Sequence, residues 1–325
     1  MAFLAILLRR LAQAAGLLVA VAILNFSLIH LAPGDIVSTI VGEMGGASEE
    51  TIAQLRHGYG LDRSFPEQLW IYLARVATGD LGSSHYYNMP VFNLILDRVP
   101  ATVLLVLTAL AFALVVGTTL GVLAARFPRG WFAAFVNLLS LFGFSAPVFW
   151  SGLMLLLLFA SVIPILPPGG YYDIVVGAKG FGKVLDIAHH LVLPATTLAL
   201  IFLALYSRLA RASMLEVLGS DYVRTARAKG VPESTVVFKH ALRNALLPVV
   251  TIAGLQFSAM LAGAVLVETV FTWPGLGQLA FESILRRDNQ LILGILLLSA
   301  LLVTFGNLIT DILYRIVDPR IKADG

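Results

Sequence analysis

The sequence predicts an all-α protein whose six helices cross a membrane. Of its 325 residues, 58% are hydrophobic and only 13% are charged, whereas soluble domains carry about 25% charged residues. Six stretches without Asp, Glu, Lys or Arg are long enough to cross a hydrocarbon core, which takes about 20 residues of helix. In lipid, a single spanning segment satisfies its own backbone polar groups only as a helix.

The six apolar stretches follow one another along the chain, and the third needs an interruption. They are residues 11–34, 99–125, 130–172, 187–207, 244–267 and 289–310. Pro147 lies in the middle of the third stretch, which is too long for one simple span. We predict a short approach helix or a kinked helix from about Trp131 to Ile163, followed by an irregular loop. Two full spans remain the alternative, and they would place the chain ends on opposite sides.

The positions of Lys and Arg predict the orientation of these spans. With six spans, fourteen of the 22 basic residues fall on one side: Arg9, Arg10, Arg126, Arg129, Arg208, Arg211, Arg224, Arg227, Lys229, Lys239, Arg243, Arg315, Arg320 and Lys322. We therefore expect both termini to be cytoplasmic and the first span to be uncleaved. This topology accounts for the net charge of +3 without binding to nucleic acid.

The loop after the first span is long enough to fold on the outer face. Ser48 predicts a helix start, and Gly58 predicts the end of that helix. A second helix is predicted to begin at a capping box of Ser64 and Glu67 and to run to Gly79.

Three apolar side chains of this second helix, Trp70, Ile71 and Leu73, could pack on the membrane domain. The alternative is a solvated loop without a role in transport.

A second informative loop lies between the fourth and fifth spans. Ser220 is a candidate N-cap for a short helix whose first turn holds Asp221, where a negative charge suits the helix dipole. Gly230 is suited to end that helix in a left-handed conformation, and Pro232 is suited to start the next one. These signals predict a rigid elbow of two helices. An ordinary positively charged loop is the alternative interpretation.

Motifs for chemistry on this chain are lacking. There is no phosphate loop of the type GxxxxGK[ST] and no cysteine. His189 and His190 are adjacent, so they point to different faces of a helix and suit interfacial anchoring better than chelation. Gly117 and Gly121 form a GxxxG pattern, which indicates close helix packing. The predicted span interiors carry no charge, which argues against an ion pump or proton relay.

A path for a polar solute would have to use uncharged polar side chains. The candidates are Ser145, Gln256, Ser258 and Asn307. Each could equally bond to a neighbouring helix.

The chain resembles the permeases of ABC importers, and more specifically the dipeptide and oligopeptide permease family. The resemblance rests on "DYVRTARAKG" at 221–230 and "HALRNALLP" at 240–248. It extends over nearly the whole chain through "LLRRL" at 7–11, "HLAPGD" at 30–35, "GLDRSFPEQ" at 60–68, "TGDLGSS" at 78–84, "LILDRVPAT" at 94–102, "HLVLPATTLAL" at 190–200, "VETVFTWPGLG" at 267–277 and "DPRIK" at 318–322.

The resemblance implies that the elbow docks into a groove on a separate ATPase subunit. Arg224, Thr225 and Ala226 take the place of the family's general "EAA" triplet, and Gly230 that of the glycine that follows. Arg224 thus replaces an acidic residue, and Leu247-Pro248 lies further downstream than usual, as in the peptide subgroup. The coupling residues implied are Asp221, Tyr222, Arg224, Thr225, Ala226, Ala228 and Gly230.

The expected fold is thus that of a type I ABC importer permease with an external insertion. Its parts are an N-terminal segment with the first span (1–31), an external loop (32–98), a transmembrane domain (99–316) with the coupling elbow within 213–243, and a tail (317–325).

The resemblance implies an importer with several other subunits in the bacterial inner membrane. These are a second homologous permease, two ATPase subunits and a periplasmic or lipid-anchored solute-binding protein. ATP and Mg belong to the ATPase subunits, so this chain is expected to bind no cofactor or metal and to be no enzyme. Related permeases carry dipeptides, longer peptides, glutathione or nickel complexes. The alternatives are an ion-coupled secondary transporter and a membrane-embedded enzyme.

Overall fold

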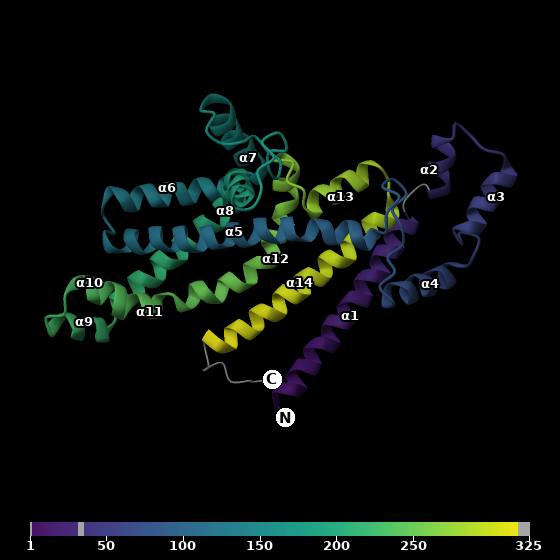
Figure 1. The fold of residues 1–325 in the computed structure, drawn as a ribbon. Coiled ribbons are helices and arrows are strands. Elements are labelled where there is room, and N and C mark those ends of the chain that lie inside the picture. The colour runs from purple at the N-terminus through teal and green to yellow at the C-terminus, as the bar shows by residue number, and fades with distance from the viewer. Residues whose placement is uncertain (1, 32–35, 318–325) are drawn as a thin grey trace. The chain divides into compact units, whose positions relative to one another are not determined.

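The computed structural model describes residues 2–31 and 36–317. The predicted closing motif at 318–322 therefore lies outside the described residues. Within them the chain is helical without a named strand, and its one isolated β-bridge joins Ser83 to Pro90. The chain divides into two compact units, Met1–Pro100 with Leu279–Leu308 and Ala101–Gln278 with Ile309–Gly325. Each unit is described by itself, with the helix labels of Figure 1.

The first unit contains the predicted first span and the external loop. Its helices are α1 (Ala2–Leu31), α2 (Ile36–Glu43), α3 (Glu49–Gly58) and α4 (Phe65–Ala77), followed by the beginning of α5 (Val91–Arg126), the end of α13 (Leu276–Leu285) and most of α14 (Asn289–Val317). The Ser48 hydroxyl accepts a hydrogen bond from Thr51 N at 3.2 Å, which confirms the predicted start of α3. Helix α2, which is eight residues long, was not predicted.

The predicted capping box at the start of α4 is wrong. Ser64 has the extended backbone of an N-cap but makes no side-chain cap bond, and Glu67 instead accepts a hydrogen bond from Arg63 at 3.2 Å. Trp70 is 72% exposed, and Ile71 and Leu73 are half-buried. The packing of these three side chains on the membrane domain stays a prediction.

A different face of α4 packs against α1. The Tyr72 ring stacks on Phe26 with the centroids 5.2 Å apart, and Gln68 Oε1 lies 2.7 Å from His30 Nε2. Tyr72 and Gln68 are four residues apart, so they lie on the same face of α4, and this is the face that packs on α1.

The loop before α5 is tied to the start of α14 by buried polar groups. Asp288 is 5% exposed; one of its oxygens accepts a hydrogen bond from the Ser84 hydroxyl and the other accepts one from Leu291 N at 3.2 Å. The Tyr87 hydroxyl donates to Glu282 Oε2 at 2.7 Å. Together these bonds link parts of the unit that are about two hundred residues apart in sequence.

We expect Tyr87 to ionise at a higher pH than an exposed tyrosine. Burial, together with the bond to Glu282, raises the pKa of Tyr87 from 10.0 to about 12. Because the folded-state pKa lies above the unfolded one, the contribution of Tyr87 to stability is fully present below pH 10 and is lost as pH rises through about 12. The test is an ultraviolet titration of wild type minus Tyr87→Phe, with Tyr86→Phe as the control and circular dichroism to follow folding. A Tyr87 transition near pH 10 in folded protein would contradict this expectation.

The second unit is built on long apolar helices. It contains the rest of α5, then α6 (Trp131–Ser145), α7 (Val148–Leu156), the π-helical turn η1 (Leu157–Val162), α8 (Phe181–Leu218), α9 (Asp221–Ala228), α10 (Glu233–Thr235), the π-helical turn η2 (Val236–Ala241), α11 (Leu242–Ala245) and α12 (Leu247–Val270). Its main core is lined by buried residues of α5, α8 and α12, including Leu105, Leu198 and Met260.

Close packing of α5 on α8 confirms the prediction from Gly117 and Gly121. A Cβ atom on Gly117 would lie 2.8 Å from the carbonyl oxygen of Leu203, and one on Gly121 would lie 2.9 Å from Ala210 Cβ. Because a larger residue would push the backbones apart, these two glycines set the distance between the helices.

The part of the chain that the structure describes contains four helices long and apolar enough to cross a membrane. They are Val91–Arg126, Phe181–Leu218, Glu233–Gly254 and Asn289–Leu308, and a fifth candidate is the pair Trp131–Ser145 and Val148–Val162, bent by 112°. The bend lies at Pro147, where a break was predicted, because proline cannot donate the backbone hydrogen bond that a continuing helix needs. The described part of α1 contains a shorter apolar segment, Ala12–Leu28. This is compatible with six spans, and the count of six stays a prediction.

Candidate functional site

The predicted elbow, residues 220–243, forms a bundle of short helices in the second unit. Helix α9 begins right after the end of α8, and α10, η2 and α11 follow it and lead into α12 (Figure 1). The prediction of two helical segments separated by a glycine break is confirmed.

Gly230 has the left-handed conformation that the sequence predicted, with a φ of 76°. Its N–H donates to the carbonyl of Arg227 at 2.9 Å, and the next N–H, of Val231, donates to Ala226 at 3.3 Å. The chain then turns, and Pro232 lies immediately before α10. A residue without a Cβ atom is the one that takes up this conformation with the least strain.

The prediction that Ser220 caps α9 is half right. Ser220 takes the extended N-cap backbone conformation but makes no side-chain cap bond. Its hydroxyl donates instead to the Val217 carbonyl at 2.5 Å. The Val217 carbonyl lies only three residues back, in the last turn of α8, so it competes with the N–H groups at the start of α9 for the serine hydroxyl.

An ion pair between Arg227 and Glu233 joins the two halves of the elbow, and the sequence prediction missed it. Arg227 Nη2 lies 2.7 Å from Glu233 Oε1 and Arg227 Nε lies 3.1 Å from Oε2, a bidentate arrangement. The hydrogen bond from Arg227 lowers the pKa of Glu233, and the same bond raises the pKa of Arg227. The spacing of six residues across a turn gave no helical signal, since only neighbours three or four apart share a helix face.

The elbow is anchored to the long helices by a small core. Val223 of α9 is fully buried. A second cluster joins the ends of α5 and α8 to the elbow through Val122, Ala125, Met214, Val237, Ala241 and Ala245. The Tyr222 hydroxyl accepts a hydrogen bond from Asn244 Nδ2 at 2.8 Å, which adds a polar link from α9 to α11. A displacement of α9 would therefore move the ends of these helices with it.

The opposite face of α9 is open. The exposed predicted coupling residues are Asp221, Tyr222, Arg224, Thr225, Ala228 and Gly230, whereas Ala226 is half-buried. Arg224 and Asp221 are 3.4 Å apart with side chains 75% and 96% exposed, and an exposed pair of this kind contributes little to stability. Both charges are thus accessible to another molecule.

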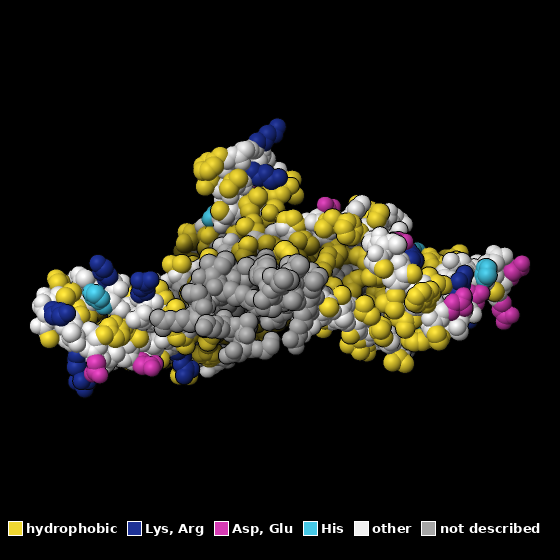
Figure 2. Space-filling view, turned by 90° about the horizontal axis from the view of Figure 1, so that it is seen from below, with side chains coloured by type: hydrophobic (Ala, Val, Ile, Leu, Met, Phe, Trp, Pro, Cys, Tyr) yellow, Lys and Arg dark blue, Asp and Glu magenta, His cyan; other side chains and the backbone are white. Residues whose placement is uncertain are grey.

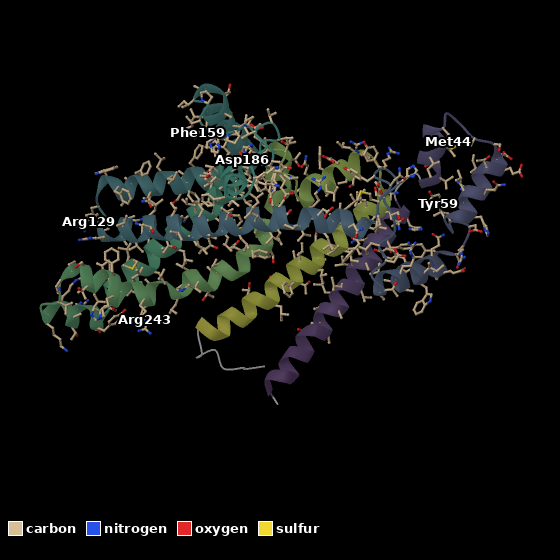
Figure 3. All side chains as sticks on the ribbon, in the orientation of Figure 1. Met44, Tyr59, Arg129, Phe159, Asp186 and Arg243 are labelled. Atoms are coloured by element: carbon tan, nitrogen blue, oxygen red, sulfur yellow. The ribbon has the colours of Figure 1, made fainter. Side chains whose placement is uncertain are left out.

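Basic side chains gather around this end of the second unit (Figure 2). Figure 3 shows Arg129 on the turn between α5 and α6 and Arg243 on α11, both toward the end at which α9 lies. The surface beside α9 is therefore rich in positive charge.

The four predicted path residues lie on three helices, α6, α12 and α14, and their role in a path stays a prediction. In the second unit, Ser145 is exposed at the end of α6, and Gln256 and Ser258 are half-buried on α12. Asn307 is exposed on the part of α14 that belongs to the first unit.

The two adjacent histidines point in different directions, as predicted. His190 is buried and its Nδ1 lies 2.9 Å from the Asp186 carbonyl oxygen. His189 Nε2 lies 3.0 Å from the carbonyl oxygen of Ile165 in the loop after η1. His190 therefore bonds to the backbone of α8 itself, whereas His189 bonds to the backbone of the loop after η1.

Glu268 directly follows the fifth predicted apolar stretch, 244–267, and the sequence analysis gave it no partner. It lies near the end of α12, and its side chain is fully buried. Its carboxylate accepts hydrogen bonds from the Thr102 hydroxyl at 2.6 Å, Gly277 N at 2.6 Å and Gln278 N at 3.2 Å. These bonds fix the first turn of α13 to α12 and α5.

Two family models match the chain. The model described as "Binding-protein-dependent transport system inner membrane component" matches residues 117–323. The corresponding N-terminal model matches residues 3–106.

Curated relatives match along nearly their whole length. The chain is 40% identical to the dipeptide transport system permease protein DppB of Escherichia coli strain K12, with 97% of this chain and 98% of that protein covered. It is 39% identical to DppB of Alkalihalophilus pseudofirmus, with 98% and 99% covered. It is 42% identical to the di/tripeptide transport system permease protein DppB of Pseudomonas aeruginosa, with 93% and 94% covered.

A solved structure shares the fold. An inward-facing structure of the MetNI methionine ABC transporter contains a chain that matches with a TM-score of 0.54 and 18% sequence identity. The match covers 69% of this chain and 96% of that one.

Proposed function

The chain belongs to the family of binding-protein-dependent transport system inner membrane components, the membrane-spanning permease subunits of ABC transporters, and we propose from this premise that it imports short peptides. It is a non-catalytic subunit. The observation that carries the peptide proposal is the identity of 39–42% to di- and tripeptide permeases over nearly the full chain. Longer peptides, glutathione and nickel complexes are the other solutes that the family resemblance leaves open.

We propose that the elbow couples this chain to an ATPase subunit. The support is geometric: α9 presents Asp221, Arg224 and Thr225 outward while its buried side packs near the ends of α5 and α8. The small residues Ala226 and Ala228 allow a partner surface to approach closely, and charged groups at its rim make charge-assisted contacts. Gly230 holds the angle between the two halves of the elbow.

The proposed complex contains a second homologous permease, two ATPase subunits and an external solute-binding protein. ATP and Mg bind to the ATPase subunits. Closure of the ATPase pair moves the elbow, and the spans switch from outward to inward opening by alternating access. In this proposal both termini and the elbow are cytoplasmic, which agrees with the positive charge beside α9, and the external loop is residues 32–98.

The proposed solute path is lined by uncharged polar side chains. Ser145 and Asn307 are exposed in their units, and Gln256 and Ser258 are half-buried on α12. A path of this kind would contact peptide groups by hydrogen bonds without selecting one side chain, and solute selection would rest mainly with the binding protein.

The test is reconstitution of the chain with its permease, ATPase and binding-protein partners in liposomes. We expect the subunits to co-purify, and uptake of a labelled dipeptide to require ATP and to exceed uptake of the free amino acids. Uptake by this chain alone, driven by a proton or sodium gradient without an ATPase, would overturn the proposal in favour of a secondary transporter. ATP-dependent uptake of another solute only would overturn the peptide assignment and keep the permease role.

A further inference from the structure

A small pocket lies between α6 and α8 in the second unit, close to the end that carries the elbow. Its volume is about 320 Å³, and its lining residues are Val136, Asn137, Ser140, Ser207, Arg208, Arg211, Ala212 and Leu215. It is separate from the exposed face of α9 and from the polar side chains proposed for the path.

The pocket has an excess of positive charge. Arg208 and Arg211 line it, no acidic residue does, and neither arginine pairs with a carboxylate among the residues that the structure describes. Arg211 Nη1 donates to Asn137 Oδ1 at 3.0 Å, but its Nε is shielded from solvent and has no hydrogen-bond partner within the described ranges. An unmet donor on a shielded cation is costly, so an anionic acceptor would stabilise this arrangement.

The two serines of the pocket already have hydrogen-bond partners, so the arginines are the groups available to a ligand. The Ser140 and Ser207 hydroxyls are 2.8 Å apart, and they also lie 2.8 Å and 3.0 Å from the carbonyl oxygens of Val136 and Ala204. The serines are therefore satisfied by each other and by backbone. The two guanidinium groups supply the free N–H donors, and guanidinium groups are well matched to phosphate oxygens.

The surroundings of the pocket are apolar and open. Leu138 and Leu141 on α6 are 65% and 63% exposed, and Leu215 on α8 is 39% exposed. Arg208 holds its guanidinium carbon 5.5 Å from the ring centroid of Phe144, which keeps the charge at the mouth of the pocket. Because the predicted fourth span ends at residue 207, we expect these arginines to lie near the lipid headgroups, with the exposed leucines available for acyl chains.

We propose that this pocket binds the phosphate headgroup of an anionic phospholipid, with the acyl chains along the exposed face of α6. A basic pocket between membrane helices on the cytoplasmic side is suited to such headgroups. A free phosphate or a peptide carboxylate would use the same arginines but would leave the exposed leucines uncovered. The inference rests on the membrane location of the chain and is independent of its solute.

The experiment measures lipid binding to the purified, delipidated complex by native mass spectrometry. Phosphatidylglycerol is titrated against phosphatidylcholine on wild type, on the double variant Arg208→Gln/Arg211→Gln and on the charge-matched control Arg126→Gln/Arg129→Gln. Two arginines near an anionic headgroup predict a loss of phosphatidylglycerol affinity of about thirtyfold in the pocket variant. We expect the control variant and all phosphatidylcholine affinities to change by less than about threefold.

Three outcomes would overturn the proposal. Equal phosphatidylglycerol binding by the pocket variant and the control would show that the pocket is not the site. Displacement of the lipid by millimolar inorganic phosphate would assign the arginines to a soluble anion. Because the chain has no cysteine, Ala212→Cys can be labelled with a maleimide. Protection by phosphatidylglycerol would support the lipid site, whereas protection by complex assembly alone would show that a partner subunit covers it.

Discussion

Replacing Gly230 by valine is expected to lower solute uptake about tenfold while the complex still assembles and hydrolyses ATP. Gly230 has a φ of 76°, and no atom lies within 4 Å of the position that a Cβ would occupy. The substitution therefore meets no steric clash with neighbours, and its cost comes from the backbone alone. A left-handed conformation costs an L-residue about 1–2 kcal/mol, and about 1.4 kcal/mol is a tenfold change in an equilibrium.

The strain is expected to be relieved by rotation of α10 relative to α9. The Arg227–Glu233 pair would resist that rotation only weakly, since both side chains are more than 40% exposed and exposed pairs contribute little. The elbow would then present its outward residues at an altered angle. If the elbow transmits closure of the ATPase pair to the spans, a smaller fraction of the complexes would switch conformation when the ATPase subunits close.

The matched control is Gly219→Ala, at the end of α8. Gly219 has a φ of −82°, and an added Cβ would lie at ordinary contact distances, 3.4 Å and 3.6 Å, from two carbonyl oxygens of α8. We expect its uptake to equal that of wild type. Arg224→Glu reverses an exposed charge without backbone strain and is expected to reduce uptake as well. Uptake and assembly untouched in both Gly230→Val and Arg224→Glu would contradict the coupling role of the elbow.

Replacing Glu268 by alanine is expected to cause the largest loss of stability of any single substitution considered for this chain. The change removes the acceptor of three hydrogen bonds and leaves the Thr102 hydroxyl and two backbone N–H groups of α13 buried. Unsatisfied buried donors cost about 1–3 kcal/mol each, so a loss on the order of 4 kcal/mol is expected. The measurement is thermal unfolding of the purified complex in detergent.

Two further variants separate the carboxylate from its side-chain volume. Glu268→Gln keeps one oxygen acceptor but presents an amide donor to the donors around it, so we expect an intermediate loss. Glu216→Gln changes an exposed acid on α8 and is expected to leave the unfolding midpoint unchanged. A midpoint for Glu268→Ala within error of wild type would show that these buried bonds contribute no net stability.

The burial of Glu268 could not be predicted from the sequence. Span ends were placed at charged residues because an isolated charge is costly in lipid. Glu268 avoids that cost by meeting the Thr102 hydroxyl and the first N–H groups of α13, a helix that was not predicted. The carboxylate and Thr102 are 166 residues apart in sequence, so no local pattern indicated the contact.

In the elbow, too, local backbone preferences could be predicted from the sequence, whereas side-chain contacts could not. Gly230 and Pro232 were predicted correctly because their backbone preferences are intrinsic to the residue. Ser220 was given the wrong bond because its hydroxyl had two acceptable partners within reach, and the end of α8 decided between them. The Arg227–Glu233 pair depended on the angle of the turn at Gly230, which the residue types alone do not specify.

The sequence by itself determined the membrane class, the positions of the apolar stretches, the close packing at Gly117 and Gly121, and the two-helix elbow. These features follow from hydrophobicity and backbone preference. Both are properties of single residues and their near neighbours, and they can be summed over a segment of the sequence. Only the tertiary structure decided which carboxylate is buried, which side of α4 packs on α1 and which residues of α6 face Arg208 and Arg211. Those outcomes depend on polar groups far apart in sequence, whose burial is tolerated only where three-dimensional packing supplies a partner.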